Sequence, residues 1–399
     1  MVLLERSDSI RHQRRVSRAE TCCAVVDGYL TLSGKHGSLV LHPLWVRERS
    51  AEPGSVDPSN RQRLLEPLDV PADLTVCHAA VAHGGGVEVH FSDGHRMHLS
   101  AEHVDTAFGC SEVDALPCAV PWTIDDAGGA LAVFDYATLG RRGAAADTMM
   151  LAILDQYFRH GWFMLRNTPA IAGALHEITA HFGRISATNF GTLFDVRTEQ
   201  VPSDLAYTPV ALSAHTDQPY RRPTPGLQFL HTIVNDAPGG ASTVVDGMAA
   251  VEALAVADPE AYVVLSTLSI EFRYDVGADV KVVRAPLIEL HQDGSFRQLR
   301  YSPRLDFAPA ADRELLDIYY RGRRWLAAEL NSAHRQVEVR MEAGDVMVVD
   351  NHRVLHGRTS FDPTRGRRHL QGCYIDHDGP ETAWRLAARR AVAREATQP

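Results

Sequence analysis

The residues with the clearest chemical potential are a histidine and an aspartate two positions apart. His215 and Asp217 stand in the segment LSAHTDQPY. On a β-strand, side chains two apart project from one face, so this pair can offer an imidazole and a carboxylate to one metal ion. The pair alone is weak evidence, because HxD sequences often arise by chance.

A second histidine and an arginine make the pattern far more specific. His356 follows a short apolar strand in DVMVVDNHRVLHGRTSF, and Arg368 comes twelve residues later. Two histidines and one carboxylate form the facial triad that holds Fe(II) with neighbouring positions open. A 2-oxo acid can chelate through two of these positions and O₂ can take the third, while the arginine fork grips the co-substrate's second carboxylate. The pattern predicts His215, Asp217 and His356 as catalytic metal ligands and Arg368 as a co-substrate-binding residue.

Composition and charge argue against several other classes of protein. The chain has 399 residues and a formal net charge of −10, and no basic stretch is long enough to follow a phosphate backbone, so no nucleic-acid partner is expected. It has no GxSxG elbow, and SGKHGS lacks the features of a phosphate-binding loop. Without a signal-peptide core, a membrane-length apolar run or a cysteine framework, the sequence predicts a cytoplasmic protein with no membrane partner.

The elements that position these residues are predicted to form two domains. Short alternating runs between Cys22 and Leu99, broken by Asp-Gly and Gly-Gly turns, predict the hairpins of a small N-terminal β-rich domain. Scattered proline and glycine between residues 101 and 129 predict the linker. We place the boundary at residue 115, which gives domains 1–115 and 116–399.

The second domain is predicted to be mainly β with flanking helices. It opens with two helical patterns, Asp147 to His160 and Ile171 to Phe182, separated by the strand-like WFMLRN. After Tyr207, strand-like runs dominate, with helical runs at about 247–257 and 311–330. This order favours a helix-supported β-sandwich or jelly roll over a doubly wound parallel sheet.

Several segments resemble the signature blocks of a known family. AYTPVALSAHTD, PGLQFLHTIVNDAPGGASTVVDG, LHGRTSF and RHLQGCYID are similar to segments of the 2-oxoglutarate and Fe(II)-dependent dioxygenases of the taurine dioxygenase-like group, above all the γ-butyrobetaine and trimethyllysine hydroxylases. The resemblance implies a double-stranded β-helix catalytic domain and the cofactors Fe(II), 2-oxoglutarate and O₂. It also implies that Ser242, after Gly239 and Gly240, assists co-substrate binding.

The same resemblance implies a pocket for a small-molecule cationic substrate. Phe190, Phe194, Tyr207 and Tyr374 fall on the positions of an aromatic cage, which suits a quaternary ammonium group that has no N–H to donate. From the residues alone, we would expect these aromatic side chains to fill the core.

Two substrate positions depart from the family, at Asp204, which is usually Asn, and at Gln218, which is usually Tyr. An ionised Asp204 would repel a substrate carboxylate, so γ-butyrobetaine itself is expected to be a poor substrate. The nearby Arg221 and Arg222 fit a solvated turn better than a contact with an anionic substrate or lid.

The N-terminal segment LHPLWVRERS...DPSNRQRLL is similar to the family's small accessory domain, which holds a zinc through three cysteines and one histidine. The matching stretch RERSAEPGSVDPS contains no cysteine, although His95 stands at the histidine position. A site without thiolates is a poor zinc site, so we expect the accessory zinc to be lost.

These observations predict a 2-oxoglutarate-dependent non-haem iron dioxygenase that hydroxylates a small betaine or amine. Asp217 argues against halogenation, which needs its coordination position vacant. Two alternatives stay open: the same chemistry on an amino acid, phosphonate or natural-product intermediate, and a non-catalytic cupin-like module that binds a small molecule. The oligomeric state also stays open, a homodimer included.

Overall fold

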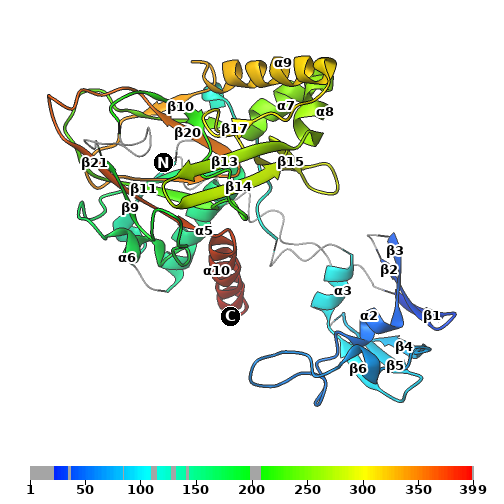
Figure 1. Cartoon of the computed structure of the whole chain (residues 1–399). Helices are drawn as coiled ribbons and strands as arrows, with labels where there is room; N and C mark the ends of the chain where they lie inside the picture. Colours follow the sequence, from blue (N-terminus) through cyan, green and yellow to red (C-terminus); the bar gives the residue numbers. More distant parts are fainter. Residues whose placement is uncertain are drawn as a thin grey trace. The chain divides into compact units, whose positions relative to one another are not determined.

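The computed structural model describes residues 22–34, 37–83, 85–108, 115–126, 132–140, 143–197 and 208–397. Its contacts divide the chain into two compact units, Met1–Ala115 and Leu116–Pro399 (Figure 1). Within the described ranges, none of the helices combines the length and apolar character that crossing a membrane requires.

The first unit contains two three-stranded antiparallel sheets, in the orders β1-β2-β3 and β4-β5-β6. Alternate residues point into its core, so Leu30 and Leu32 of one sheet and Val87 and Val89 of the other are fully buried. The elements are β1 (Cys22–Val26), β2 (Tyr29–Gly34), β3 (Gly37–Leu41), α2 (Pro43–Arg47), η1 (Pro67–Asp69), β4 (Val76–Val81), β5 (Val87–Phe91), β6 (Arg96–Leu99) and α3 (Ala101–Ala107).

Helix α3 occupies the start of the stretch that the sequence predicted as linker. Ser100 caps it by accepting a hydrogen bond from the backbone N–H of His103 at 3.2 Å, and Val104 is buried in the core of the first unit. The linker prediction was therefore wrong for residues 101–107, because one buried face is enough to fix so short a helix.

A hydrogen bond links the cysteine-free stretch of the first unit to His95. Ser50, in the cysteine-free stretch, lies with its Oγ 3.0 Å from Nε2 of His95 and is almost fully buried. Burial lowers the pKa of His95, and the charge of Arg47 lowers it further. The histidine is therefore a neutral hydrogen-bonding partner of a serine.

The second unit is built on two sheets. The larger has the order β7-β8-β19-β11-β21-β9 and the smaller β10-β20-β12-β18, and all pairings are antiparallel except that of β7 with β8. The strands of these two sheets are β7 (Val133–Asp135), β8 (Trp162–Arg166), β9 (Phe194–Arg197), β10 (Leu212–His215), β11 (Leu227–Asn235), β12 (Ser242–Asp246), β18 (Val337–Val339), β19 (Val346–Asp350), β20 (Val354–Arg358) and β21 (Arg368–Ile375).

Helices and short hairpins cover the outer faces of the sheets. The remaining elements are η2 (Ile124–Asp126), η3 (Tyr136–Thr138), α5 (Ala144–His160), α6 (Leu175–Thr179), α7 (Gly247–Ala257), α8 (Pro259–Thr267), β13 (Ile270–Val276), β14 (Asp279–Ala285), β15 (Ile288–Leu290), β16 (Phe296–Leu299), β17 (Asp306–Phe307), α9 (Arg313–Leu330) and α10 (Asp378–Thr397). In Figure 1, α7, α8 and α9 lie together on one side of the sheets.

The helix expected from Ile171 to Phe182 is shorter than its pattern suggested. Helix α6 covers only Leu175–Thr179. Gly173 just before it has a left-handed φ of +86°, and its N–H donates to the side chain of Gln371 at 2.8 Å. A residue with positive φ cannot continue an α-helix, so the regular turns begin after it.

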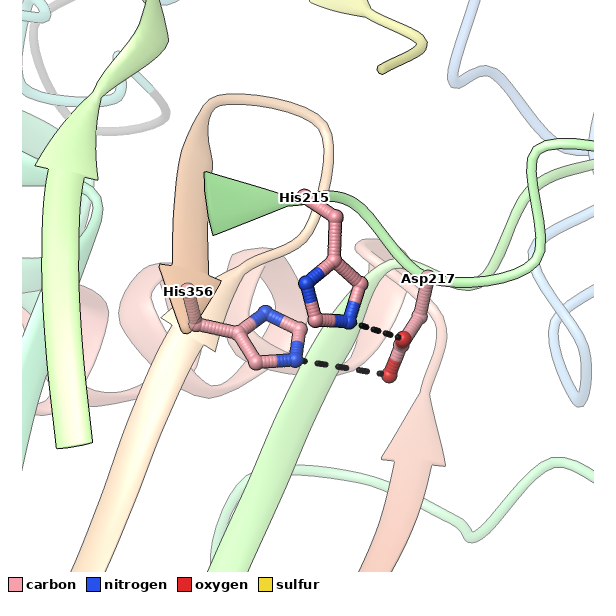
Figure 2. Close-up of side chains that lie close together, drawn as sticks. All are labelled: His215, Asp217 and His356. Carbon is pink, nitrogen blue, oxygen red and sulfur yellow. Dashed lines mark ion pairs between the residues drawn. The ribbon is translucent and has the colours of Figure 1, made fainter. Parts of the chain in front are cut away.

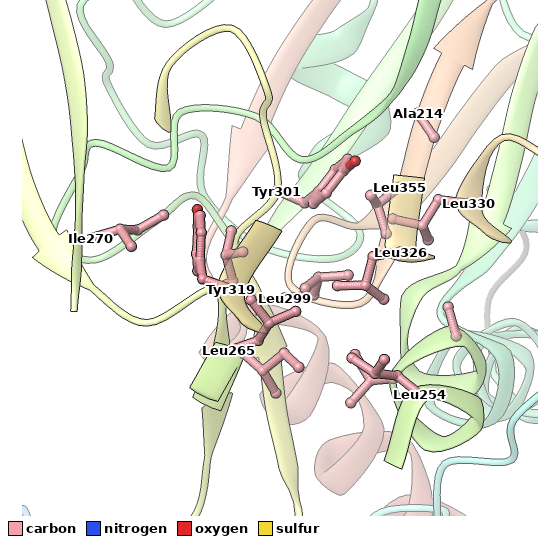
Figure 3. Close-up of a cluster of buried hydrophobic side chains, with 14 of the residues drawn as sticks. Ala214, Leu254, Leu265, Ile270, Leu299, Tyr301, Tyr319, Leu326, Leu330 and Leu355 are labelled. Carbon is pink, nitrogen blue, oxygen red and sulfur yellow. The ribbon is translucent and has the colours of Figure 1, made fainter. Parts of the chain in front are cut away.

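The core is layered because central strands of the larger sheet are buried on both faces. Phe163 and Leu165 of β8 pack towards α5 and α6, whereas the alternating Trp162 and Met164 pack between the two sheets. A third cluster fills the space between the smaller sheet and the helices α7 to α9; Tyr319 is one of its fully buried members (Figure 3). Because side chains pack against both faces of the larger sheet and against the smaller sheet, the residues on these strands are held in fixed positions.

Candidate active site

The two histidines of the predicted triad lie directly opposite each other on neighbouring strands. His215 ends β10 and pairs in register with His356 in the middle of β20. Their ring centroids are 4.5 Å apart, and both side chains point towards Asp217 (Figure 2). Strand pairing therefore brings together two residues that are far apart in the sequence.

Asp217 is placed by a loop and not by a strand. Strand β10 ends at His215, so the expectation that both residues project from one strand face was wrong. Instead, the Asp217 N–H donates to Oδ1 of Asn351 at 2.6 Å, and Nδ2 of Asn351 donates to the Asp217 carbonyl at 3.0 Å. Asn351 lies in the turn between β19 and β20, so this side chain fixes the Asp217 loop against the strand that carries His356.

The donor atoms of the triad converge at short range. Nε2 of His215 lies 3.5 Å from Oδ1 of Asp217, and Nε2 of His356 lies 3.7 Å from Oδ2. The two rings are more than nine-tenths buried, and the three ligand atoms all lie within 4.8 Å of one another. Such a cluster matches the size of a single metal site.

The protonation states also suit a metal. Nδ1 of His215 is 2.9 Å from the carbonyl oxygen of Ser213, to which it can only donate, so Nε2 of the neutral ring presents its lone pair. Burial lowers the pKa of His356 to about 4. Burial alone would raise the pKa of Asp217, but His356 and His215 hold it well below its usual range. Two imidazoles and one carboxylate are the donor set of a non-haem Fe(II) site.

Further hydrogen bonds orient the carboxylate. The hydroxyl of Tyr374 donates to Oδ2 of Asp217 at 2.6 Å, and the side-chain amide of Gln228 donates to the same oxygen. Burial and the charge of Asp217 raise the pKa of Tyr374, so its proton stays on the phenol. Both donors act on one oxygen and leave Oδ1 facing His215.

Arg368, the first residue of β21, lines the same cavity, and none of the described carboxylates forms an ion pair with it. Its residue exposure is 7%, and no partner accepts a hydrogen bond from its Nε. Burial, together with the charges of Arg358 and Arg340, lowers its pKa to about 9. Its guanidinium has the ring of Phe361 at 5.5 Å. A buried guanidinium beside other cations is a site that a carboxylate would complete.

The second of two adjacent glycines makes room for that arginine. Gly239 and Gly240 have φ values of +82° and +67°, and a Cβ on Gly240 would lie 2.9 Å from Nε of Arg368. Ser242 begins β12 just beyond them and lines the cavity, where its Oγ has only the sulfur of Met341 at 3.5 Å. Its hydroxyl remains available for a ligand.

The cavity between the sheets has a volume of about 110 Å³. Besides the triad, Arg368 and Ser242, it is lined by the predicted substrate residues Phe190, Phe194, Gln218 and Tyr374. Gln218 has a left-handed φ of 51°, and its Oε1 accepts a hydrogen bond from Arg221 at 3.4 Å. The predicted residues Asp204 and Tyr207 lie outside the described residues.

The aromatic side chains form one wall of the cavity. The rings of Phe194 and Tyr374 stack with centroids 5.3 Å apart, and Phe190 lies 6.4 Å from Phe194. Gly372 makes the stack possible, because a Cβ there would lie 2.4 Å from the ring of Phe194. Ring faces next to an iron-type donor set can bind a cationic group.

Sequence reasoning missed several residues of this site. Tyr220 and Tyr274 extend the aromatic wall by stacking at 4.9 Å, and Tyr274 meets Phe190 edge-on. Arg304 also lines the cavity. One available signal was Gln228, a polar residue near the start of the mainly apolar run Leu227–Leu230.

A second group of potential ligands lies elsewhere in the same unit. Asp350, His352 and His377 gather near the ends of β19 and β21, and Nε2 of His377 lies 3.0 Å from Oδ1 of Asp350. Oδ1 of Asp350 also accepts the backbone N–H of His352. The ion pair and hydrogen bonds account for this group without a metal.

Comparison with known proteins identifies the family. Residues 132–374 match the family described as "Taurine catabolism dioxygenase TauD, TfdA family". The chain is 35% identical to γ-butyrobetaine dioxygenase of Pseudomonas sp. (strain AK-1), over 84% of this chain and 88% of that enzyme. It is 29% identical to Dioxygenase str8 of Strobilurus tenacellus, over 85% of this chain and 82% of that protein.

Similar solved structures include that of an asparagine oxygenase in complex with Fe(II), 3-hydroxyasparagine and succinate. It has a TM-score of 0.46 and 17% sequence identity, covering 58% of this chain and 79% of that chain. The family match spans more than half of the chain, and the first of these relatives is similar over most of its length. The chain therefore belongs to the TauD/TfdA family and is a 2-oxoglutarate-dependent non-haem iron dioxygenase.

Proposed function

We propose that this dioxygenase hydroxylates a small cationic substrate, a betaine or an amine, in the cavity between the two sheets of a double-stranded β-helix. The observation that carries the proposal is the presence in one cavity of a His-Asp-His donor set, a buried uncompensated arginine and a wall of aromatic rings. The γ-butyrobetaine dioxygenase relative, similar over most of its length, supports a quaternary ammonium head group.

In this proposal, His215, Asp217 and His356 hold Fe(II), and Arg368 and Ser242 bind 2-oxoglutarate. Bound Fe(II) supplies the chemistry that couples oxidative decarboxylation of 2-oxoglutarate by O₂ to hydroxylation of a substrate C–H bond. Tyr374 and Gln228 keep the Asp217 carboxylate oriented, and the buried Arg368 attracts the far carboxylate of the co-substrate. The aromatic wall decides which carbon faces the metal.

The first unit serves in this proposal as an accessory domain without zinc. The hydrogen bond between Ser50 and His95 supports this view, because it uses the histidine that a metal would need.

The test is succinate formation from 2-oxoglutarate in the presence of Fe(II) and a panel of betaines and amines. A cationic compound should stimulate turnover and be recovered with one added oxygen. Neutral isosteres that replace the quaternary nitrogen by carbon should not. If only neutral or anionic compounds stimulated turnover, the proposed substrate class would be wrong.

The triad is tested with His215→Ala, Asp217→Ala and His356→Ala. Each removes one of three protein bonds to iron, so each should abolish turnover and weaken Fe(II) binding while the circular dichroism spectrum stays that of a folded protein. His377→Ala removes a histidine from the other His-Asp group and is the matched control. Wild-type turnover by any triad variant would contradict the assignment.

A further inference from the structure

A cationic cleft adjoins the iron cavity. This outer cleft is lined by Thr188, Asn189, Tyr220, Arg221, Arg222, Asp279, Lys281, Val282, Val283 and Arg284. Tyr220 also lines the iron cavity, and Phe190, the neighbour of Asn189, lines that cavity as well. The outer cleft and the cavity therefore meet at Tyr220 and at the segment that contains Asn189 and Phe190.

Two arginines of the outer cleft have charges that no carboxylate balances. Arg221 donates to the side-chain oxygen of Gln218 at 3.4 Å and to the carbonyl of Ala187 at 3.2 Å, and Arg222 donates to the carbonyl of Arg284 at 3.1 Å. All three acceptors are neutral. In the part of the chain that the structure describes, neither arginine forms an ion pair.

The other two cations of the outer cleft differ in this respect. Lys281 pairs with Asp279, and Arg284 pairs with Glu271 at 3.3 Å. The charge that remains available in the outer cleft is therefore that of Arg221 and Arg222.

An unsatisfied amide lies beside these charges. Neither the nitrogen nor the oxygen of the Asn189 side chain is exposed to solvent, and neither has a hydrogen-bond partner. Buried polar groups are almost always paired, so an orphaned amide in a cleft indicates a ligand that completes it. Its N–H groups, together with two guanidinium groups, suit the oxygen atoms of an anion.

The loop that carries the arginines is held rigidly. Arg300 is 7% exposed, pairs with Glu289 and donates to the carbonyl oxygens of Pro219 at 2.8 Å and Arg221 at 3.2 Å. The loop follows Asp217 directly, so the position of the two arginines is tied to the iron site. Such preorganisation favours binding because little order is lost when the ligand arrives.

We propose that the outer cleft binds an anionic group, a carboxylate or a phosphate, at the end of the substrate that lies away from the iron. The inference rests on the proposed function and narrows it: the substrate carries a cationic group for the aromatic wall and an anion for Arg221, Arg222 and Asn189. It also replaces the solvated turn that the sequence suggested for the two arginines.

The test uses two probe series that differ only in charge at one end. The first contains ω-trimethylammonio carboxylates with chains of four to six carbons, and the second contains the corresponding carboxamides. Their dissociation constants are measured by calorimetry with Fe(II) and 2-oxoglutarate under nitrogen, and KM and kcat are measured in air. The proteins are the wild type, Arg221→Gln, Arg222→Gln and the double variant.

For the best carboxylate, the double variant should raise the dissociation constant and KM at least tenfold and change kcat little. Values for the matching carboxamide should change less than twofold. Arg273→Gln is the control, because this arginine is paired with Asp275 and does not line the outer cleft. Equal shifts for both series, or no shift for the carboxylates, would overturn the inference.

A free anion is the other source of the same chemistry. Inorganic phosphate should compete with the carboxylate probes in the wild type and leave carboxamide turnover unchanged. If phosphate stimulated carboxamide turnover in the wild type but not in the double variant, the outer cleft would be an effector site and the assignment to substrate would be wrong. If no cationic probe bound at all, the proposed function would fail together with this inference, whereas binding that ignores Arg221 and Arg222 would overturn only the inference.

Discussion

The second unit buries two arginines in opposite ways. Arg353 is 4% exposed and donates from Nε and Nη2 to both carboxylate oxygens of Asp246 at 3.0 and 2.8 Å, while its other hydrogen bonds go to the carbonyls of Arg159 and Val120. Although burial lowers its pKa, Asp246 holds that pKa above the usual value. Arg368 is buried almost as deeply, yet no described carboxylate pairs with it, and burial and the charges of Arg358 and Arg340 lower its pKa.

We infer from the difference that Arg353 has a structural role and that Arg368 binds a ligand. A buried guanidinium that the fold needs is given a carboxylate and carbonyl groups, as at Arg353. One that is left without them destabilises the protein until a ligand arrives, as we propose for Arg368 and 2-oxoglutarate. An arginine of the second kind is therefore a stronger indicator of a ligand site than any count of charged residues.

The largest expected effect comes from breaking the complete pair. Arg353→Met leaves the carboxylate of Asp246 buried without its partner, which should lower the free energy of unfolding by about 3–5 kcal/mol. Chemical denaturation followed by fluorescence measures this. Arg159→Met, which removes an exposed arginine paired with Asp155 at 2.9 Å, should change stability by less than about 0.5 kcal/mol. Equal losses of unfolding free energy in both variants would show that burial and pairing do not make Arg353 special.

Arg368→Lys should impair function without such a loss. Lysine keeps the charge but not the planar fork, so we expect the KM for 2-oxoglutarate to rise at least tenfold and substrate affinity to change little. Steady-state kinetics with varied 2-oxoglutarate gives both values. The exposed neighbour Arg367 is the control, and Arg367→Lys should behave as wild type. If only Arg367→Lys raised the KM, Arg367 and not Arg368 would bind the carboxylate of 2-oxoglutarate.

Arg368→Met should make the ligand-free protein more stable. Removing a buried and uncompensated charge is expected to raise the free energy of unfolding by about 1 kcal/mol, because a methionine fills the space without needing a partner. Saturating 2-oxoglutarate should stabilise the wild type and not the variant. Thermal denaturation with and without 2-oxoglutarate tests both points; a destabilised variant would mean that Arg368 has a structural role after all.

A partly exposed ion pair should contribute less to the free energy of unfolding than the buried Arg353–Asp246 pair. In the Asp350–His377 pair, burial lowers the pKa of His377, but Asp350 holds it above the usual 6.5. The stabilisation is therefore complete below pH 6.5 and disappears as pH rises through the raised pKa. His377→Gln should cost at most about 1 kcal/mol at pH 6 and progressively less towards pH 9. A deficit that grew with pH would contradict this sign.

The smallest effect is expected in the first unit, where the sequence predicts that an accessory zinc has been lost. The purified protein should contain no stoichiometric zinc, and a mild chelator should leave the unfolding temperature of the first unit unchanged. Ser50 and His95 provide the reason, because a serine at position 50 offers no thiolate and its hydrogen bond occupies Nε2 of His95. Elemental analysis decides the point: one tightly held zinc per chain would show that other residues supply the donors.

The clustering of His215, Asp217 and His356 in one cavity with Arg368 could be predicted from the sequence, because each residue stands in a short contiguous block whose spacing is informative. The position of Asp217 could not, because it depends on two hydrogen bonds to Asn351, more than a hundred residues away. The same limit applies to the aromatic wall, in which Tyr220 and Tyr274 come from separate segments. Helices α8 and α10 were also missed, since the sequence pattern emphasised the strands around them.

The pairing of Arg368 with Gly240 gives a rule for interpreting related sequences. Because a single methyl group at position 240 would reach the guanidinium, the arginine can occupy its site only while the glycine is present. In evolution, the two positions should therefore be retained or lost together. A relative that keeps the arginine but carries a larger residue at the glycine position is expected to have lost its co-substrate, even if its histidines and aspartate are intact.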